Sequence, residues 1–216
     1  MAGGARVRGL FLDLDGTLAD SMPVMRQVYF DFLARLGRAG SAAEFDSVVG
    51  ITLLQTVKVL KGAHGLEQDP LDLLRFYNSL VDGVYITHAA PTPGARALLL
   101  AARAAGVYSA VVTSAIRPVA AGWLAHNGLD ALVAAIVAAE DVAYGKPDPE
   151  PYSKALGLAG IAAHEGLAVE DSSTGARAAM AAGIPTWIVG PPGLRPRPAG
   201  AAGAVERLDE LIGLLG

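Results

Sequence analysis

Short apolar runs of about four or five residues alternate along this chain with longer stretches in which apolar residues recur every three or four positions. Short, uninterrupted apolar runs are typical of strands covered on both faces, and the longer periodic stretches are typical of amphipathic helices. The expected strands are residues 9–13, 108–113, 135–138, 166–170 and 186–189. The expected helices are residues 94–105, 118–127, 149–156, 174–182 and 205–215. This alternation predicts an α/β fold, built as a Rossmann-like parallel sheet core with helices on both faces.

Glycine and proline mark the expected ends of these elements. Glycine is common just after a helix because it adopts a positive φ without strain. The glycines expected in this role are Gly106, Gly128, Gly157 and Gly183. The Pro- and Gly-rich segment 190–203 is expected to form an exposed loop before the last helix.

One interval, from about residue 18 to residue 91, interrupts the alternation. Its apolar residues follow a helical period, no strand is expected in it, and further helices are expected at 52–60 and 71–84. An interval of this length exceeds a connection between a strand and the next helix, so it predicts an inserted α-helical cap domain. The expected domains are a catalytic core formed by residues 1–18 and 92–216 and an insertion formed by residues 19–91.

The insertion begins directly after Asp13 and Asp15, two acids at the end of the first expected strand. A domain attached by two neighbouring connectors above a site is expected to open and close as a lid. A fixed helical layer docked on the core is the alternative.

Composition and charge exclude several classes of protein. The chain has 216 residues, 52% of them hydrophobic, with 17 Lys and Arg against 21 Asp and Glu and no Cys. Its net charge of −4 and the lack of a basic cluster argue against a nucleic acid partner. The absence of Cys excludes disulfides, thiolate catalysis and Cys-ligated metals. With no apolar stretch suited to a signal peptide or a membrane span, we expect a cytoplasmic protein without a membrane anchor; its oligomeric state stays open.

Paired acids follow two of the expected strands. Asp13 and Asp15 end the first strand, and Glu170 and Asp171 end the fourth. Carboxyl ends of parallel strands are where an open α/β sheet binds ligands. Acids brought together there repel one another unless a cation intervenes, and Mg²⁺ prefers such oxygen ligands. The residues therefore predict a Mg²⁺ site, whereas the alternative is that the acids cap the helices that follow.

Three further residues suit phosphate binding. Thr113 and Ser114 end the second expected strand, where hydroxyl and backbone N–H groups can bind phosphate oxygens. Lys146 lies between Gly145 and Pro147 in a loop, and an ammonium group there suits a phosphoryl group and a neighbouring carboxylate. The alternatives are a helix cap for the hydroxyl residues and a solvated loop lysine.

Taken in order, these residues resemble the motifs of the haloacid dehalogenase superfamily over nearly the entire chain. The four motifs it resembles are Asp13-Leu14-Asp15-Gly16-Thr17, then Thr113 with Ser114, then Lys146, then Glu170-Asp171. The helical insertion is similar to the small cap of the phosphoglycolate phosphatase and β-phosphoglucomutase subgroup. The resemblance implies a Mg²⁺-dependent phosphatase that acts on a small phosphorylated metabolite.

The resemblance also implies a role for each site residue. Asp13 is expected to be the nucleophile that forms an aspartyl-phosphate, and Asp15 the general acid and base. Thr113, Ser114 and Lys146 are expected to bind the phosphoryl group. Mg²⁺ is expected on Asp13, Asp171 and the backbone carbonyl of Asp15, with Glu170 acting through water.

Two other functions remain open from the sequence. The first is a β-phosphoglucomutase-type phosphomutase, although the His and the cap Arg usual in such enzymes are missing. The second is a non-catalytic protein that binds phosphate or a partner. Substrate recognition is expected in the cap, where Lys58, Lys61, His64 and Arg75 either meet an anionic substrate or are solvated charges on helix faces.

Overall fold

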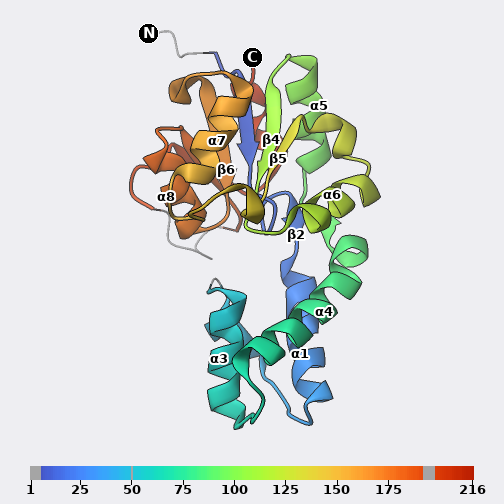
Figure 1. Ribbon diagram of the computed structural model, residues 1–216. Coiled ribbons are helices and arrows are strands. Elements are labelled where there is room, and N and C mark those ends of the chain that lie inside the picture. Colours follow the sequence, from blue (N-terminus) through green and yellow to red (C-terminus); the bar gives the residue numbers. More distant parts are fainter. Residues whose placement is uncertain (1–5, 50, 192–197) are drawn as a thin grey trace. The chain divides into compact units, whose positions relative to one another are not determined.

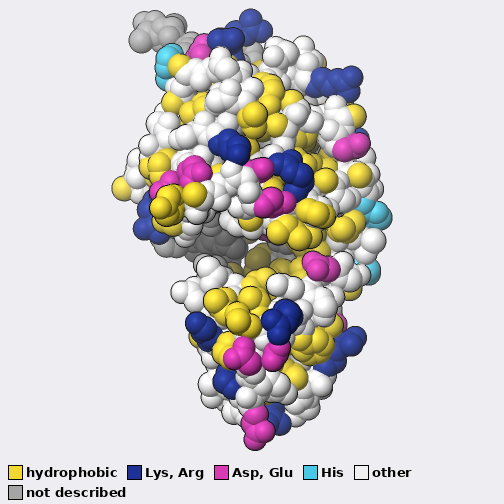
Figure 2. Space-filling view, viewed as in Figure 1, with side chains coloured by type: hydrophobic (Ala, Val, Ile, Leu, Met, Phe, Trp, Pro, Cys, Tyr) yellow, Lys and Arg dark blue, Asp and Glu magenta, His cyan; other side chains and the backbone are white. Residues whose placement is uncertain are grey.

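The computed structural model describes residues 6–49, 51–191 and 198–216 (Figure 1). It divides into two compact units. One unit contains the chain up to Asp20 and from Ala90 onward, and the other contains Ser21–Ala89. No helix among the described residues is both long and apolar enough to span a bilayer. On the face shown in Figure 2, acidic and basic side chains are interspersed.

The larger unit is built on a six-stranded sheet in which all neighbouring strands are parallel. Its spatial order is β5-β4-β1-β6-β7-β8. The strands are β1 (Gly9–Leu12), β4 (Tyr108–Val112), β5 (Ala135–Val137), β6 (Gly166–Glu170), β7 (Thr186–Val189) and β8 (Gly203–Val205). The expectation of an α/β fold with a parallel sheet is confirmed, and five of the six strands were expected.

Helices cover the sheet because its strands are apolar on both faces. The helices of this unit are α5 (Ala95–Ala104), α6 (Arg117–His126), α7 (Glu150–Ala159) and α8 (Ser173–Ala181). Phe11 of β1 packs in one buried cluster with Tyr152 of α7 and Ala178 of α8. Leu10 and Leu12 point to the opposite face and are also fully buried, so both faces of β1 are covered.

The smaller unit is helical, as the period of its apolar residues predicted. It contains α1 (Met22–Arg35), α2 (Ala42–Val48), α3 (Leu53–His64) and α4 (Pro70–His88). α1 packs against α4 through Phe32, whose ring lies 5.6 Å from that of Phe76 and 5.1 Å from that of Tyr77. Side-chain caps begin α2, α3 and α4, because Ser41, Thr52 and Asp69 each accept a backbone N–H.

Two short strands occur where none was expected. β2 (Ala19–Asp20) pairs antiparallel with β3 (Ala90–Pro91). The Thr92 N–H also donates to the Leu18 carbonyl at 2.8 Å. The two chain segments that connect the helical insertion are therefore joined by backbone hydrogen bonds. Strands of two residues carry too few side chains for a period to be visible in the sequence.

The last helix, expected at residues 205–215, is shorter than expected and is a 3-10 helix. Val205 instead ends β8, which pairs with β7, and the 3-10 helix η4 (Leu208–Leu214) follows. At Gly203, a Cβ would lie 2.4 Å from the Trp187 ring, so the missing side chain lets β8 approach β7. Pairing with a distant strand takes Val205 out of the expected helix, which therefore begins later. Within the expected loop 190–203, residues 192–197 lie outside the described residues.

Three of the four expected helix-ending glycines are confirmed. Gly106, Gly128 and Gly183 have φ values of 71°, 61° and 80°. The expectation for Gly157 is wrong, because α7 continues to Ala159 and ends at Gly160, whose φ is 64°. Gly157 is tolerated inside the helix because interior glycine costs only about 1 kcal/mol relative to Ala.

Candidate active site

The carboxyl ends of three adjacent strands bring the predicted site residues together. Asp13 directly follows β1, Thr113 directly follows β4, and Glu170 ends β6. Since β1 pairs with both β4 and β6, residues far apart in the sequence become neighbours at one edge of the sheet. The Asp13 N–H extends this pairing by donating to the Val169 carbonyl at 3.1 Å.

Asp13, Glu170 and Asp171 form a compact group that we call the acid cluster. Each offers a carboxylate oxygen that lies within 4.8 Å of the other two. The residues are 7%, 0% and 9% exposed, so the cluster is almost completely shielded from water. Three carboxylates in so small a volume have the oxygen chemistry that a hard divalent cation requires.

Lys146 inserts its ammonium group among these acids. Its Nζ lies 2.6 Å from Asp13 Oδ1, 2.6 Å from Glu170 Oε1 and 2.8 Å from the Val112 carbonyl. These three acceptors match the three N–H donors of an ammonium group. The Lys146 side chain is only 7% exposed, so it is a directed, buried cation and not the solvated loop lysine of the alternative reading.

The charges of the site are not balanced by Lys146 alone. Burial raises the pKa of Asp13 well above its usual range, Lys146 opposes this shift, and Glu170 and Asp171 add to it. Burial alone would lower the pKa of Lys146, but Asp13 and Glu170 outweigh burial and hold that pKa above its usual value. The cluster therefore has more negative charge than one ammonium offsets, and a divalent cation fits this imbalance.

Glu170 is held by two further side chains, which the sequence did not single out for this role. Tyr152 donates its hydroxyl to Glu170 Oε1 at 2.7 Å, and Ser172 donates to Oε2 at 3.1 Å. Burial, followed by the charge of Glu170, raises the pKa of Tyr152 well above its usual value, so this phenol stays a donor. In the sequence, Tyr152 is an aromatic residue with a hydroxyl early in the helix that follows the Lys146 loop, and this position is too ordinary to single it out.

Two glycines make room for the carboxylates. At Gly16, which has a φ of 79°, a Cβ would lie 2.1 Å from Asp171 Oδ2. At Gly175, a Cβ would lie 2.0 Å from Glu170 Oε1. Both distances are far shorter than any non-bonded contact, so the two positions exclude every other residue while the acids keep these places.

The model of the haloacid dehalogenase-like hydrolase family matches residues 10–189, which include the whole acid cluster and Lys146. The chain belongs to this family. The expectation of a haloacid dehalogenase-type hydrolase, drawn from the order of its motifs, is therefore confirmed.

Individual relatives of this haloacid dehalogenase-like hydrolase match almost end to end. The plasmid phosphoglycolate phosphatase of Cupriavidus necator is 34% identical, over 95% of this chain and 92% of that protein. Hexitol phosphatase A of Escherichia coli is 32% identical, over 89% of this chain and 87% of that protein. The structure of a hydrolase of this family from Deinococcus radiodurans, with bound phosphate and sodium, is 30% identical with a TM-score of 0.77, over 98% of each chain.

The other residues predicted for the site are Thr113 and Ser114, which follow β4, and Asp15, which lies two residues after Asp13. In this hydrolase Thr113 is 4% exposed, and its Oγ1 accepts the Ala115 N–H at 3.0 Å, which closes a local turn. This is not a helix cap, because the N-cap of α6 is Ile116 and that helix has no side-chain cap. A hydroxyl that accepts one hydrogen bond keeps its own hydrogen for a further acceptor. Ser114 is exposed, and Asp15 is partly buried with its charge felt by Asp13.

The cap cations expected to meet a substrate are mostly engaged within the helical unit. Lys61 donates to the carbonyls of Leu66 and Gln68 at 2.6 and 2.9 Å. His64 is hydrogen-bonded to Glu44, and Arg75 is paired with Asp72. These contacts account for three of the four side chains as parts of the helical unit itself, whereas Lys58 is exposed.

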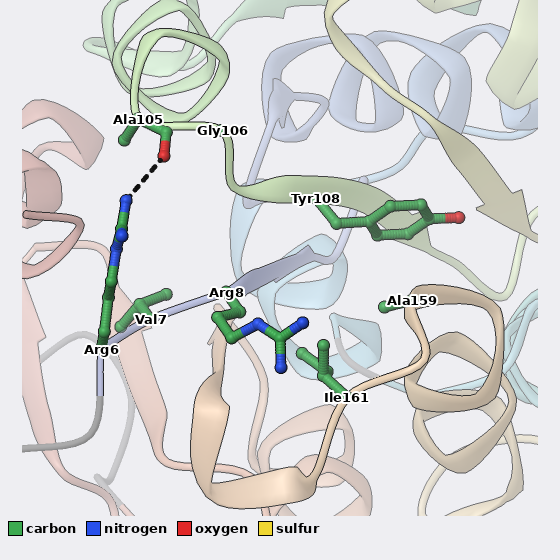
Figure 3. A pocket seen from close by; sticks show the side chains of 8 residues that line it. All are labelled: Arg6, Val7, Arg8, Ala105, Gly106, Tyr108, Ala159 and Ile161. Carbon is green, nitrogen blue, oxygen red and sulfur yellow. Dashed lines mark hydrogen bonds between the residues drawn. The ribbon is translucent and has the colours of Figure 1, made fainter.

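A separate hollow of about 460 Å³ lies where β1 and β4 begin, at the opposite edge of the sheet (Figure 3). It is lined by Arg6, Val7, Arg8, Ala105, Gly106, Tyr108, Ala159 and Ile161. Arg6 donates to the last turn of α5 at the Ala105 carbonyl, and Arg8 pairs with Glu165 at 3.0 Å. Because both cations already stabilise the fold and no predicted site residue lines this hollow, the candidate active site remains the acid cluster.

Proposed function

We propose that this hydrolase is a phosphatase that cleaves small phosphate monoesters through an aspartyl-phosphate on Asp13. The observation that carries the proposal is the contact of Lys146 Nζ with Asp13 Oδ1 at 2.6 Å, beside Glu170 and Asp171. A nucleophilic carboxylate that faces a phosphate dianion needs positive charge at this point, and the site is built to supply it.

The proposed substrate class follows from the named activities of the relatives. They include phosphoglycolate phosphatases, hexitol phosphatase A and fructose-1-phosphate phosphatase YqaB. Their names share a phosphate monoester of a small organic acid, polyol or sugar. We place the substrate of this chain in that class.

In the first step, a carboxylate oxygen of Asp13 forms a bond to phosphorus while the ester P–O bond breaks. The bonding electron pair leaves on the alkoxide oxygen, which takes a proton from Asp15. Lys146 offsets the repulsion between the carboxylate and the phosphoryl oxygens. Thr113 and the backbone N–H of Ser114 bind the transferring oxygens and hold the phosphorus in line with Asp13.

In the second step, water attacks the phosphorus of the aspartyl-phosphate and its proton passes to the Asp15 carboxylate. The P–O bond to Asp13 breaks, its electron pair returns to the Asp13 carboxylate, and inorganic phosphate leaves. Asp15 is then protonated again, so one residue serves as acid and base in turn. Both residues end the cycle in their starting states.

The acid cluster fits a Mg²⁺ ion. Asp13, Asp171 and the backbone carbonyl of Asp15 are the residues we assign to hold it. Glu170 is assigned a role through water, since its oxygens accept hydrogen bonds from Lys146, Tyr152 and Ser172. When bound, Mg²⁺ supplies positive charge that stabilises the transferring phosphoryl group.

The test is a panel of phosphate monoesters incubated with the purified protein and Mg²⁺, with release of inorganic phosphate as the readout. The panel contains phosphoglycolate, hexitol phosphates, fructose 1-phosphate and p-nitrophenyl phosphate. We expect hydrolysis of at least one ester by the wild-type protein and none by Asp13→Asn, which keeps the size of the side chain but is not a nucleophile. Circular dichroism checks that the variant is folded.

Three outcomes overturn parts of the proposal. Equal phosphate release by Asp13→Asn removes the nucleophile assignment. Conversion of a sugar 1-phosphate into a 6-phosphate without net phosphate release shows a phosphomutase. Binding of phosphate without turnover of any ester shows a non-catalytic phosphate-binding protein.

A further inference from the structure

The loop of residues 142–149, which we call the lysine loop, has to place one ammonium group accurately. The Lys146 side chain is 7% exposed and reaches acceptors at 2.6 Å. The backbone around it is at the surface, with Ala143, Tyr144 and Gly145 all exposed. Tyr144 is 68% exposed, so burial of this large side chain does not anchor the loop. Something other than packing must hold this part of the loop.

Glu150, the first residue of α7, reaches back to the start of the lysine loop. Its Oε1 accepts the Ala143 N–H at 2.9 Å and its Oε2 accepts the Tyr144 N–H at 2.8 Å. These hydrogen bonds lower the pKa of Glu150, so it is an anion at neutral pH. Within the described residues, both oxygens are bonded to the loop backbone, and neither is bonded to the acid cluster.

The same turn of the chain is closed on its other side. The Asp148 N–H donates to the Gly145 carbonyl at 3.0 Å, which encloses Lys146 in a tight turn. The Glu150 N–H in turn donates to Asp148 Oδ1 at 2.9 Å. Glu150 is thus bonded on both sides of Lys146, through its side chain before the lysine and through its backbone after it.

We propose that Glu150 is a positioning residue, which fixes the lysine loop so that Lys146 reaches Asp13 and Glu170. The proposal rests on the proposed function, in which Lys146 stabilises charge during phosphoryl transfer. Without the Glu150 carboxylate, the N–H groups of Ala143 and Tyr144 turn to water and the loop gains freedom. A lysine that is displaced by about 1 Å costs up to about 100-fold in rate.

The central test compares Glu150→Gln with a control glutamate outside the lysine loop, Glu210→Gln. Glu210 also accepts two backbone N–H groups, those of Glu206 and Arg207, at 3.1 and 2.8 Å, but both bond to Oε1. Gln keeps the size of the side chain but replaces one acceptor oxygen by an NH₂ group. We expect Glu150→Gln to lower kcat about 10-fold to 100-fold with KM nearly unchanged, and Glu210→Gln to keep wild-type kcat.

A double-mutant cycle separates positioning from a general loss of structure. In a Lys146→Gln background, measured at high enzyme concentration, Glu150→Gln is expected to lower the residual rate no further, because the group it positions is gone. Amide exchange at Ala143 and Tyr144 is expected to be faster in Glu150→Gln, independently of any activity. If Glu150→Gln does not fold, Glu150→Asp, which keeps both oxygens, replaces it and is expected to give an intermediate kcat.

Failure of this inference differs from failure of the proposed function. A wild-type protein that hydrolyses no ester overturns the function, and with it the positioning role. An active wild-type protein overturns only the inference if Glu150→Gln keeps full kcat. The inference also fails if Glu150→Gln lowers kcat by the same factor in the wild-type protein and in the Lys146→Gln background. It fails as well if Glu210→Gln lowers kcat as much as Glu150→Gln does.

Discussion

At the scale of single residues, the site depends as much on its small side chains as on its charged ones. Asp171 and Glu170 occupy the space beside Gly16 and Gly175 where a Cβ would otherwise lie. Tyr152 and Ser172 use hydroxyl groups to hold Glu170 without adding charge. These neutral residues set the places of the carboxylates, and the carboxylates with Lys146 supply the chemistry.

Gly16→Ala tests this crowding, with Gly106→Ala as its matched control. Both glycines have positive φ, 79° and 71°, so both substitutions add about 1–2 kcal/mol of backbone strain. At Gly106, no described atom outside its two chain neighbours lies within 4 Å of a new Cβ, whereas at Gly16 the new Cβ displaces Asp171. We expect Gly16→Ala to lower phosphate release more than about 100-fold and Gly106→Ala to keep it. Similar activity in the two variants would contradict this account.

At the scale of elements, one polar junction ties three helices of the insertion together. Glu44 of α2 accepts the hydroxyl of Tyr29 from α1 and is bonded to His64 Nε2 of α3 at 2.9 Å. Burial, and then the bond to Glu44, raises the pKa of Tyr29 to about 12, so this phenol donates at all ordinary pH. Burial alone would raise the pKa of Glu44, but the hydrogen bonds from Tyr29 and His64 outweigh it and lower that pKa.

The lowered pKa of Glu44 predicts how the stability of the protein depends on acid. Below the usual carboxyl value of 4.5, the unfolded chain takes up a proton at Glu44 before the folded chain does. The stability that Glu44 contributes is therefore complete above that pH and is lost as pH falls through the folded pKa. We expect Glu44→Gln to lower the free energy of unfolding by about 1–2 kcal/mol at pH 7 and by less at pH 3.5, measured by urea unfolding.

Glu67→Gln is the control for this experiment, since Glu67 is exposed. Its unfolding free energy is expected to follow that of the wild-type protein at both pH values. A loss in Glu44→Gln that stays the same size at pH 7 and pH 3.5 would show that the carboxylate charge is not what holds the junction.

At the scale of the whole molecule, the carboxyl ends of β1 and β6 bring together more negative charge than the ammonium group of Lys146 balances. Asp13 and Lys146 are 133 residues apart in the sequence, and Glu170 is a further 24 residues on. Folding has to bring these groups together, and the repulsion among the acids opposes folding until a cation binds. Binding of the proposed Mg²⁺ ion is therefore expected to stabilise the folded protein.

Removal of metal is expected to lower both stability and activity. At a Mg²⁺ concentration about 100 times its Kd, the free energy of unfolding is expected to rise by about 2.7 kcal/mol, seen as a higher melting temperature than in EDTA. Asp171→Asn is expected to lose most of this rise, and NaCl at equal ionic strength is expected not to reproduce it. An identical melting temperature with Mg²⁺ and with EDTA in the wild-type protein would remove the metal site.

The parts of this fold that the sequence predicted are those with a strong local signal. The strands that end at Leu12, Val112 and Glu170 are mostly apolar runs, and the structure places them close to their expected bounds. The helix expected to begin at residue 205 begins later because Val205 belongs to β8, and pairing of β8 with β7 is not a local property. The two-residue strands β2 and β3 were missed because they carry too few residues to show a period.

The candidate site also contains residues that the sequence marked and residues that it did not. Asp13, Glu170, Asp171 and Lys146 were recognisable because charged residues at the ends of apolar strands, or between Gly and Pro in a loop, are unusual positions. Tyr152 and Glu150 were not recognisable as site residues, because a tyrosine and a glutamate at the start of a helix are ordinary there. Their roles depend on where their oxygens lie relative to Glu170 and to the lysine loop.

By itself, the sequence determined the α/β alternation, the helical insertion and the residue types available for phosphoryl chemistry, because period and composition act over short stretches of chain. The tertiary structure alone decided which of these residues meet. It placed three acceptors around Lys146 Nζ and two backbone N–H donors at the Glu150 carboxylate. The physical reason is that such contacts join groups on different elements. Their geometry is set by strand pairing and packing, and neither is visible in any one stretch of the chain.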